Sequence, residues 1–222
     1  MFATRRARSR PVIYALAGLI LVAALVPVAY ATTLVRHEEI SALVKESRRA
    51  ILGEVVGVRY GYDERHLHST WVTLRVDETI YGASPSAGNE ITFKIYGAPV
   101  AMSDGTRLFI EGTPLYRSGQ RYLLLLREDS PWRFTSATGL FQGAFAVDEK
   151  GEARSLGGNR RAFGESGLTR WLEADELDPA ARARLSNPDA PVPVRLLRRA
   201  VERLWVDLGR ALPDTGSSRT RP

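Results

Sequence analysis

Residues 70–81 read TWVTLRVDETIY, and apolar and polar side chains alternate along this stretch. Successive side chains of a β-strand point to opposite faces of a sheet, so this period of two predicts a strand with one buried face. The apolar face would consist of Val72, Leu74, Val76 and Ile80. A turn at residues 82–88 and a second alternating stretch, ITFKIY at residues 91–96, predict the neighbouring strand.

A run of five apolar residues, YLLLL at residues 122–126, stands between two arginines. It is too short for an isolated helix and shows no alternation, so it predicts a central strand that is buried on both faces. Gly53 and Gly57 predict a sharp bend in another strand. The further expected strands lie at residues 50–60, 108–110, 132–134 and 140–147, with a short return around Ala153.

Six or seven closely spaced strands with few helices predict a mainly β fold, a compact antiparallel barrel or a sandwich, at residues 32–157. A short amphipathic helix is expected at residues 38–47. Residues 158–212 are expected to form a helical extension, in which Asp178 caps a helix that starts at Pro179 and ends near Asn187. A disordered tail is expected at residues 213–222.

The last predicted helix begins at Val194 and carries an apolar stripe with Trp205 at its edge. The residues of the stripe are Leu197, Val201, Leu204 and Leu208. Such a stripe predicts packing on the body of the same chain. Contact with an anionic membrane surface or with another subunit is the alternative for residues 194–209.

The first 31 residues have the layout of an export signal. Four arginines precede an uncharged apolar run at residues 12–31, which ends in Ala29-Tyr30-Ala31. The small side chains of Ala29 and Ala31 predict cleavage after Ala31, which would leave a mature chain that begins at Thr32 in the periplasm or outside the cell. An uncleaved membrane anchor is the alternative, because about 20 apolar residues can span a bilayer.

The composition narrows the possible function classes. The 222 residues include no cysteine, which excludes disulfides, thiol catalysis and cysteine-ligated metals. The formal net charge is +6, and removal of the four arginines at the start leaves +2, so no nucleic-acid partner is expected. The chain has no nucleophile elbow, P-loop or dinucleotide fingerprint. We therefore assign no catalytic and no cofactor-binding residues.

Two of the three histidines lie in His66-Leu67-His68. On an extended strand their side chains would share a face, and with Asp63 and Glu64 they could ligate Zn²⁺ or another divalent cation. The segment also falls between two predicted strands, where polar residues at a hairpin tip need no special function. We prefer the second interpretation and assign no metal site.

Three stretches carry a resemblance to known proteins: AILGEVV at residues 50–56, Tyr81-Gly82, and GQRYLL at residues 119–124. With a short preceding helix, their order resembles a group of uncharacterised exported bacterial proteins and, more distantly, the netrin-like module of tissue inhibitors of metalloproteinases. The resemblance covers about residues 36–147. It implies a five-stranded oligonucleotide/oligosaccharide-binding (OB) barrel with flanking helices. Those inhibitors chelate zinc through an N-terminal cysteine, whereas Thr32 would offer an amine without a thiol.

These observations favour an exported, non-enzymatic binding or interaction module of the cell envelope or extracellular space. Its partner would be a protein or small ligand, with membrane contact through residues 12–31 if they are retained. The alternatives are a metalloprotease-inhibitor-like protein and a metal-dependent hydrolase that uses His66 and His68.

Overall fold

The computed structural model describes residues 38–83, 88–156, 162, 168–173, 175–185, 187, 190–210 and 212. The predicted export segment, residues 157–161 between the predicted β domain and its helical extension, and the predicted disordered tail at 213–222 lie outside the described residues.

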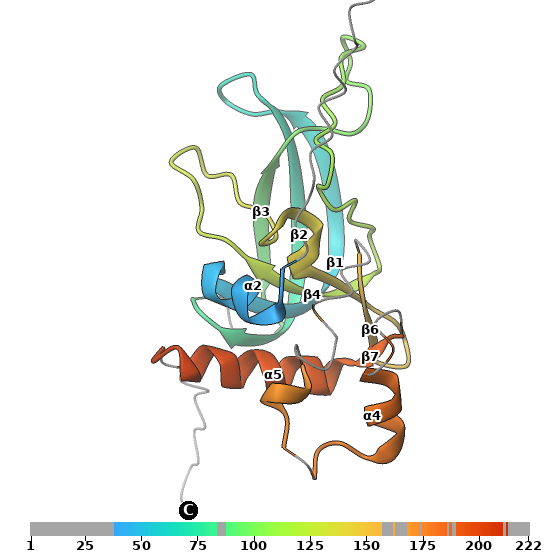
Figure 1. Ribbon diagram of the computed structural model, residues 1–222. Helices are drawn as coiled ribbons and strands as arrows, with labels where there is room; N and C mark the ends of the chain where they lie inside the picture. The colour runs from blue at the N-terminus through green and yellow to red at the C-terminus, as the bar shows by residue number, and fades with distance from the viewer. Residues whose placement is uncertain are drawn as a thin grey trace, which may run out of the picture. The chain divides into compact units, whose positions relative to one another are not determined.

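Seven antiparallel strands form one sheet in the order β3-β2-β1-β4-β5-β6-β7 (Figure 1). The strands are β1 (Arg49–Tyr62), β2 (His68–Tyr81), β3 (Glu90–Tyr96), β4 (Arg121–Leu126), β5 (Ala144–Val147), β6 (Glu152–Ser155) and β7 (Val192–Pro193). The helices are α2 (Ile40–Glu46), α4 (Pro179–Leu185) and α5 (Val194–Asp207), with short 3-10 helices η1 (Leu140–Gly143) and η2 (Thr169–Trp171). The prediction of a mainly β fold is confirmed.

Strands β1 and β2 form a long hairpin whose pairing shifts register at the glycines of β1. A Cβ atom on Gly53 would lie 2.4 Å from the carbonyl oxygen of Arg75, so only glycine allows β2 to approach this closely. The pairing slips again between Val55 and Gly57. Register slips of this kind bend a strand, as the two glycines predicted.

Strand β4 lies between β1 and β5 and is buried on both faces. Leu123 and Leu125 point into one apolar cluster, whereas Tyr122, Leu124 and Leu126 point into a second cluster on the other side. The five side chains are at most 2% exposed. The prediction drawn from YLLLL is therefore confirmed.

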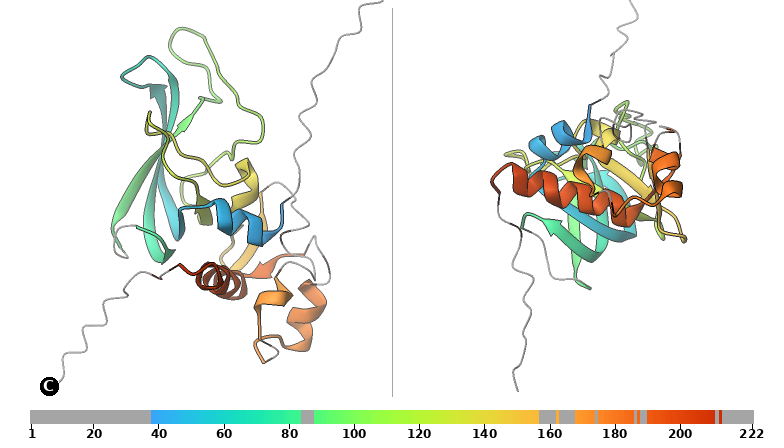
Figure 2. Two further views of the ribbon diagram at one scale, coloured as in Figure 1. Left: turned by 60° about the vertical axis from the view of Figure 1, so that its left-hand side comes forward. Right: turned by 60° about the horizontal axis from the view of Figure 1, so that its bottom comes forward.

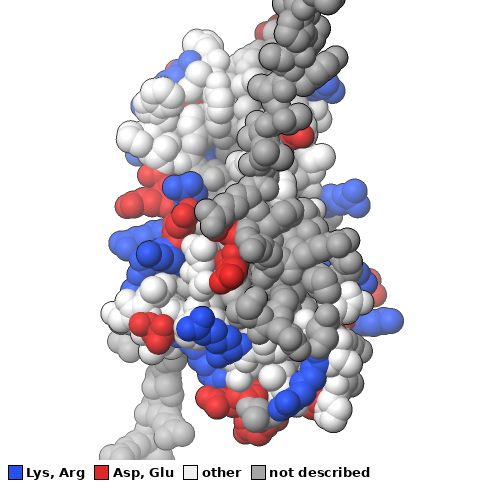
Figure 3. Space-filling view, in the orientation of Figure 1, with Lys and Arg blue, Asp and Glu red and all other residues white. Residues whose placement is uncertain are grey.

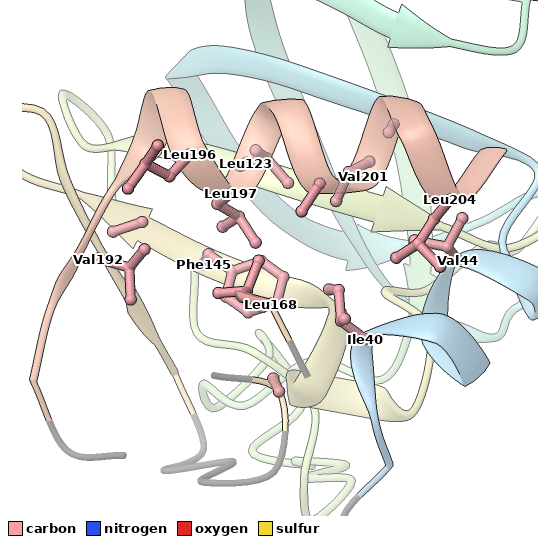
Figure 4. Packing of buried hydrophobic residues seen from close by; sticks show 14 of the residues in the cluster. Ile40, Val44, Leu123, Phe145, Leu168, Val192, Leu196, Leu197, Val201 and Leu204 are labelled. Atoms are coloured by element: carbon pink, nitrogen blue, oxygen red, sulfur yellow. The ribbon is translucent and has the colours of Figure 1, made fainter. Parts of the chain in front are cut away.

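Helices α2 and α5 cover the first cluster along one side of the sheet (Figure 2). Figure 4 shows Leu197, Val201 and Leu204 of α5 facing Leu123, Phe145 and Ile40. The predicted packing of the α5 stripe on the same chain is thus confirmed. Asp178 also caps α4 as predicted, because its Oδ1 accepts the N–H of Ala181 at 2.7 Å.

The edge of the α5 stripe differs in one position from the prediction. Trp205 is buried and stacks on Tyr81 with ring centroids 3.8 Å apart, whereas Leu208 is 38% exposed. The helix ends at Asp207 and Leu208 is its C-cap residue, so the buried face of the helix does not extend to this position. Leu196 and Ala200 complete the buried face instead.

The second cluster lies on the other side of β1, β2 and β4, and Tyr116 and Ala137 of irregular segments belong to it. The segment around residues 134–138 contacts both β3 and β4, which are the first and last strands of the group β3-β2-β1-β4. Lys94 of β3 pairs with Phe134, and Leu126 of β4 pairs with Ala137, each through an isolated bridge. The N–H of Thr135 donates to the carbonyl of Lys94 at 2.8 Å.

Two predicted strands do not form, and a third is shortened. Residues 108–110 make a single bridge, between Leu108 and Ala98, and residues 132–134 make only the bridge at Phe134. Arg133 has a positive φ of 59°, which interrupts an extended chain. The first half of 140–147 is η1 rather than strand, and Leu140 at its start has a φ of 63°.

In the part of the chain that the structure describes, none of the helices combines the length and the apolar character needed to cross a bilayer.

Replacement of Leu124 by Ala should lower the free energy of unfolding by about 2–5 kcal/mol, because its fully buried side chain would leave a cavity in the second cluster. Urea denaturation monitored by circular dichroism measures this. Val206→Ala is the matched control, since Val206 is 52% exposed, and should change the value by at most about 0.5 kcal/mol. Equal effects of the two substitutions would contradict the assignment of Leu124 to the core.

Candidate functional site

The connection from β3 to β4, residues 97–120, runs over the end of the sheet where β1 turns into β2 (Figure 1). A connection of this length without helix or strand is unusual in a small domain, and such loops commonly carry function. Two backbone hydrogen bonds between Ala98 and Leu108 hold its first half together. This loop and the neighbouring segment at residues 127–140 line the candidate site.

Two hollows that share part of their lining lie beside this loop, and we call the two together the apolar groove. The first is bounded by β3 and residues 108–116, the second by β3 and residues 127–140, and four residues line both: Ile95, Tyr96, Ile110 and Thr113. Pro99, Phe109 and Leu115 line only the first hollow, and Phe134 and Leu140 line only the second. The rings of Tyr96 and Phe134 meet edge to face across the groove, with centroids 5.4 Å apart.

Large apolar side chains are exposed around this groove. Phe109 is 51% exposed, Leu115 56% and Tyr96 44%, and Trp132 on the neighbouring segment is also exposed. Figure 3 shows that most of the described surface toward the top of the view, where the loops lie, is uncharged, whereas charged side chains gather lower down. A concentration of exposed apolar side chains around a hollow is typical of a binding surface.

The floor of the groove contains a buried tyrosine with an unsatisfied hydroxyl. The ring of Tyr116 packs edge to face on Phe93 and on Tyr122. Its Oη makes no hydrogen bond to any described residue, and burial raises the pKa of this phenol. The Oη of Tyr122, by contrast, accepts the backbone N–H of Arg117 at 3.2 Å. The two neighbouring rings thus differ in whether the hydroxyl has a partner.

A polar cluster fastens the loop to the β1–β2 hairpin. Tyr62 Oη donates to Asp104 Oδ2 at 2.6 Å, and Thr106 Oγ1 donates to Asp104 Oδ1 at 2.7 Å. His68 Nε2 lies 2.9 Å from Thr106 Oγ1. The hydrogen bond from Tyr62, followed by those from Thr106, holds the pKa of Asp104 at about 2, while the same bond to Asp104 raises the pKa of Tyr62.

This cluster holds the loop against the hairpin through several contacts to one threonine. Besides Asp104, both Tyr62 Oη and His68 Nε2 approach Thr106 Oγ1, at 2.6 and 2.9 Å. Thr106 therefore connects the loop to the end of β1 and the start of β2.

Asp63, one of the possible metal ligands, forms a buried ion pair instead. Its Oδ2 accepts a hydrogen bond from Lys94 Nζ at 2.8 Å, and its Oδ1 accepts the backbone N–H groups of Arg65 and Leu67. The Lys94 ammonium also lies 4.3 Å from the ring centre of Phe134. The hydrogen bond from Lys94 is the main reason that the pKa of Asp63 is lowered to about 2.

The structure does not bring the predicted ligand residues together. His66 lies in the turn with a φ of 58°, and β2 begins only at His68, so the premise of one extended strand was wrong. Glu64 is exposed and faces Arg65 and Lys94 at 3.6 and 3.8 Å. Among the described residues, no group of three or more metal-ligating side chains of His, Asp or Glu is close enough to hold an ion.

No protein-family model matches this chain, and no curated protein matches it.

The residues that line the groove were not among the candidates from sequence. Leu108-Phe109-Ile110 indicated a strand, which would have buried alternate side chains. A better signal was the length of the stretch between the strands ending at Tyr96 and beginning at Arg121, in which glycines and prolines separate isolated apolar residues.

Removal of the Tyr116 hydroxyl in Tyr116→Phe should leave the free energy of unfolding unchanged or raise it by about 1–2 kcal/mol, because the buried oxygen has no partner among the described residues. Tyr122→Phe is the matched control and should lower it by about 0.5–1.5 kcal/mol, since the N–H of Arg117 loses its acceptor. Chemical denaturation measures both variants. A loss above about 1 kcal/mol in Tyr116→Phe would show that its hydroxyl is satisfied.

Asp63→Asn should destabilise the protein at pH 7, and the difference from the wild type should shrink as the pH falls from about 4 to about 2. The carboxyl has a lower pKa in the folded state than in the unfolded chain, where it is near 3.9. Its stabilising contribution is therefore complete above the unfolded value and is lost as the pH falls through the folded value. Thermal denaturation of both proteins across this range measures the difference.

Asp129→Asn is the control for this prediction, because Asp129 pairs with Arg49 in an exposed position and should contribute at most about 0.5 kcal/mol at pH 7. A pH-independent difference between Asp63→Asn and the wild type would mean that Asp63 is not stabilised as a carboxylate.

Proposed function

We propose that this chain is an exported, non-enzymatic binding module of the cell envelope or extracellular space, and that the apolar groove is its binding site. The observation that carries the binding role is the groove itself, where half-exposed side chains such as Phe109 and Leu115 surround a hollow. Export is supported by the basic start, the apolar run at residues 12–31 and Ala29-x-Ala31.

We further propose that the sheet closes into a small barrel of the OB type. The bridges from β3 to Phe134 and from Ala137 to β4 support this, because they place one irregular segment between the two outer strands of the β3-β2-β1-β4 group. A ligand at the loop-covered end of such a barrel would meet the groove without disturbing the helix-covered side.

The binding proposal is tested with the apolar dye 8-anilinonaphthalene-1-sulfonate and the folded, full-length chain. Phe109→Ser and Leu115→Ser should each reduce dye binding several-fold with little change in melting temperature, because both side chains are half-exposed. Val206→Ser removes an equally exposed apolar side chain on α5 and should leave dye binding unchanged. Equal effects of all three substitutions would refute the groove as a binding site.

The export proposal is tested by the intact mass of the protein made in its native host. Cleavage after Ala31 should give a mass that corresponds to residues 32–222. A mass that includes residues 1–31 would indicate a membrane-anchored protein, and an N-terminus elsewhere would contradict the proposed cleavage site.

A further inference from the structure

The stretch at residues 107–111 alternates between half-buried and exposed side chains. Leu108 and Ile110 are half-buried and line the first hollow. The side chains between and beside them are exposed, and these are Arg107, Phe109 and Glu111. Side chains two positions apart lie on the same side of an extended stretch, so the three form one exposed row of a cation, an apolar ring and a carboxylate.

The charges on the connection at residues 97–120 are balanced. It carries two arginines and two acidic residues, and none of the four forms an ion pair within the part of the chain that the structure describes. They are Asp104, Arg107, Glu111 and Arg117. A partner surface of one sign would leave half of these charges unmatched, whereas an identical surface carries the complement of each.

The exposed row is complementary to its own reverse. Phe109 lies at its centre, with Arg107 two positions before it and Glu111 two positions after it. In a contact related by a two-fold axis, every pair of residues occurs twice with the roles exchanged. An axis at Phe109 therefore brings the two phenyl rings together and places each Arg107 beside Glu111 of the other copy.

Apolar side chains around the exposed row supply area for such a contact. Tyr96, Phe109 and Leu115 line the first hollow and are 44%, 51% and 56% exposed, and Val100, next to Pro99 of the same lining, is 40% exposed. A large apolar side chain has about 150–250 Å² of surface, so the four present about 300–450 Å². A standard interface buries about 800 Å² per partner, of which a little more than half is apolar. These side chains thus provide most of the apolar area that a stable dimer needs.

We propose that two copies of this chain associate through the exposed row, around a two-fold axis at Phe109. The two Phe109 rings pack on each other, and Arg107 of each copy pairs with Glu111 of the other. This inference goes beyond the proposed role of the groove, because it assigns the outward side chains of the connection while Leu108 and Ile110 continue to line the hollow.

Sedimentation equilibrium of the full chain, as isolated from expressing cells, measures the dimer. The wild type should dimerise at concentrations below about 100 μM. Phe109→Ser should weaken dimerisation about 10-fold or more, because it removes the central apolar contact. Val206→Ser removes an equally exposed apolar side chain on α5 and should leave dimerisation unchanged. A monomeric wild type, or association that Phe109→Ser leaves intact, would overturn the proposal.

Charge exchange tests the pairing of Arg107 with Glu111. Arg107→Glu alone and Glu111→Arg alone each place like charges across the axis and should weaken dimerisation. The double variant should dimerise as the wild type does, and an equimolar mixture of the two single variants should form a heterodimer, because opposite charges then meet at both pairs. Arg195→Glu is the control, since Arg195 is exposed and forms no ion pair among the described residues. Failure of both the double variant and the mixture to dimerise would contradict the two-fold arrangement.

The dimer and the groove are tested independently. Dye binding measured at a chain concentration below the dissociation constant of the dimer reports on the groove of a single copy. A wild type that stays monomeric but loses dye binding in Phe109→Ser would overturn the dimer and leave the groove as a binding site. A dimer that Phe109→Ser weakens without any change in dye binding would support the exposed row as the contact and refute the groove.

Discussion

Strand β4 turns no face to solvent, and the rest of the structure follows from the need to cover both of its faces. Leu123 and Leu125 require apolar neighbours on one side, and Tyr122, Leu124 and Leu126 require them on the other. Burial of one such side chain contributes about 1.5–3 kcal/mol, so neither layer can be left out. Helices α2 and α5 supply the neighbours on the first side, and on the second side Tyr116 and Ala137 of irregular segments join side chains of β1 to β3 in one cluster.

The two layers differ in how far the sequence predicted them. Some patterns are local, because the spacing within one element shows which side of that element is buried. They are the period-two alternation in β2, the apolar run of β4 and the stripe of α5. The loop layer has no such pattern. Phe134 and Leu108 each pair at a single position with a distant strand, so their place depends on contacts that no local spacing records. Sequence analysis therefore interpreted both as strands, and it placed Leu208 in the stripe because periodicity alone does not reveal that α5 ends at Asp207.

The same distinction explains why the candidate site was missed while candidate ligands were proposed. Four residues were considered as metal ligands because their side chains can bind a cation and because they lie close together in sequence. They are Asp63, Glu64, His66 and His68. The fold uses them to shape the hairpin end: Asp63 holds the turn and Lys94, and His68 contacts the loop through Thr106. A buried ion pair such as Asp63–Lys94 gives little net stability, but loss of one partner is costly, so the pair specifies how β3 meets the hairpin.

This fixed hairpin end is what allows an irregular loop to present a defined surface. Ordering each backbone residue costs about 1–2 kcal/mol, so a connection of 24 residues needs attachments along its length. Asp104 and Thr106 attach it to the hairpin, Leu108 attaches to Ala98, and Tyr116 is buried against Phe93. Between these attachments Phe109 and Leu115 stay half-exposed although the adjacent residues are held. A flexible loop would have to lose that freedom when a partner binds, whereas these attachments have already ordered the residues that a partner would meet.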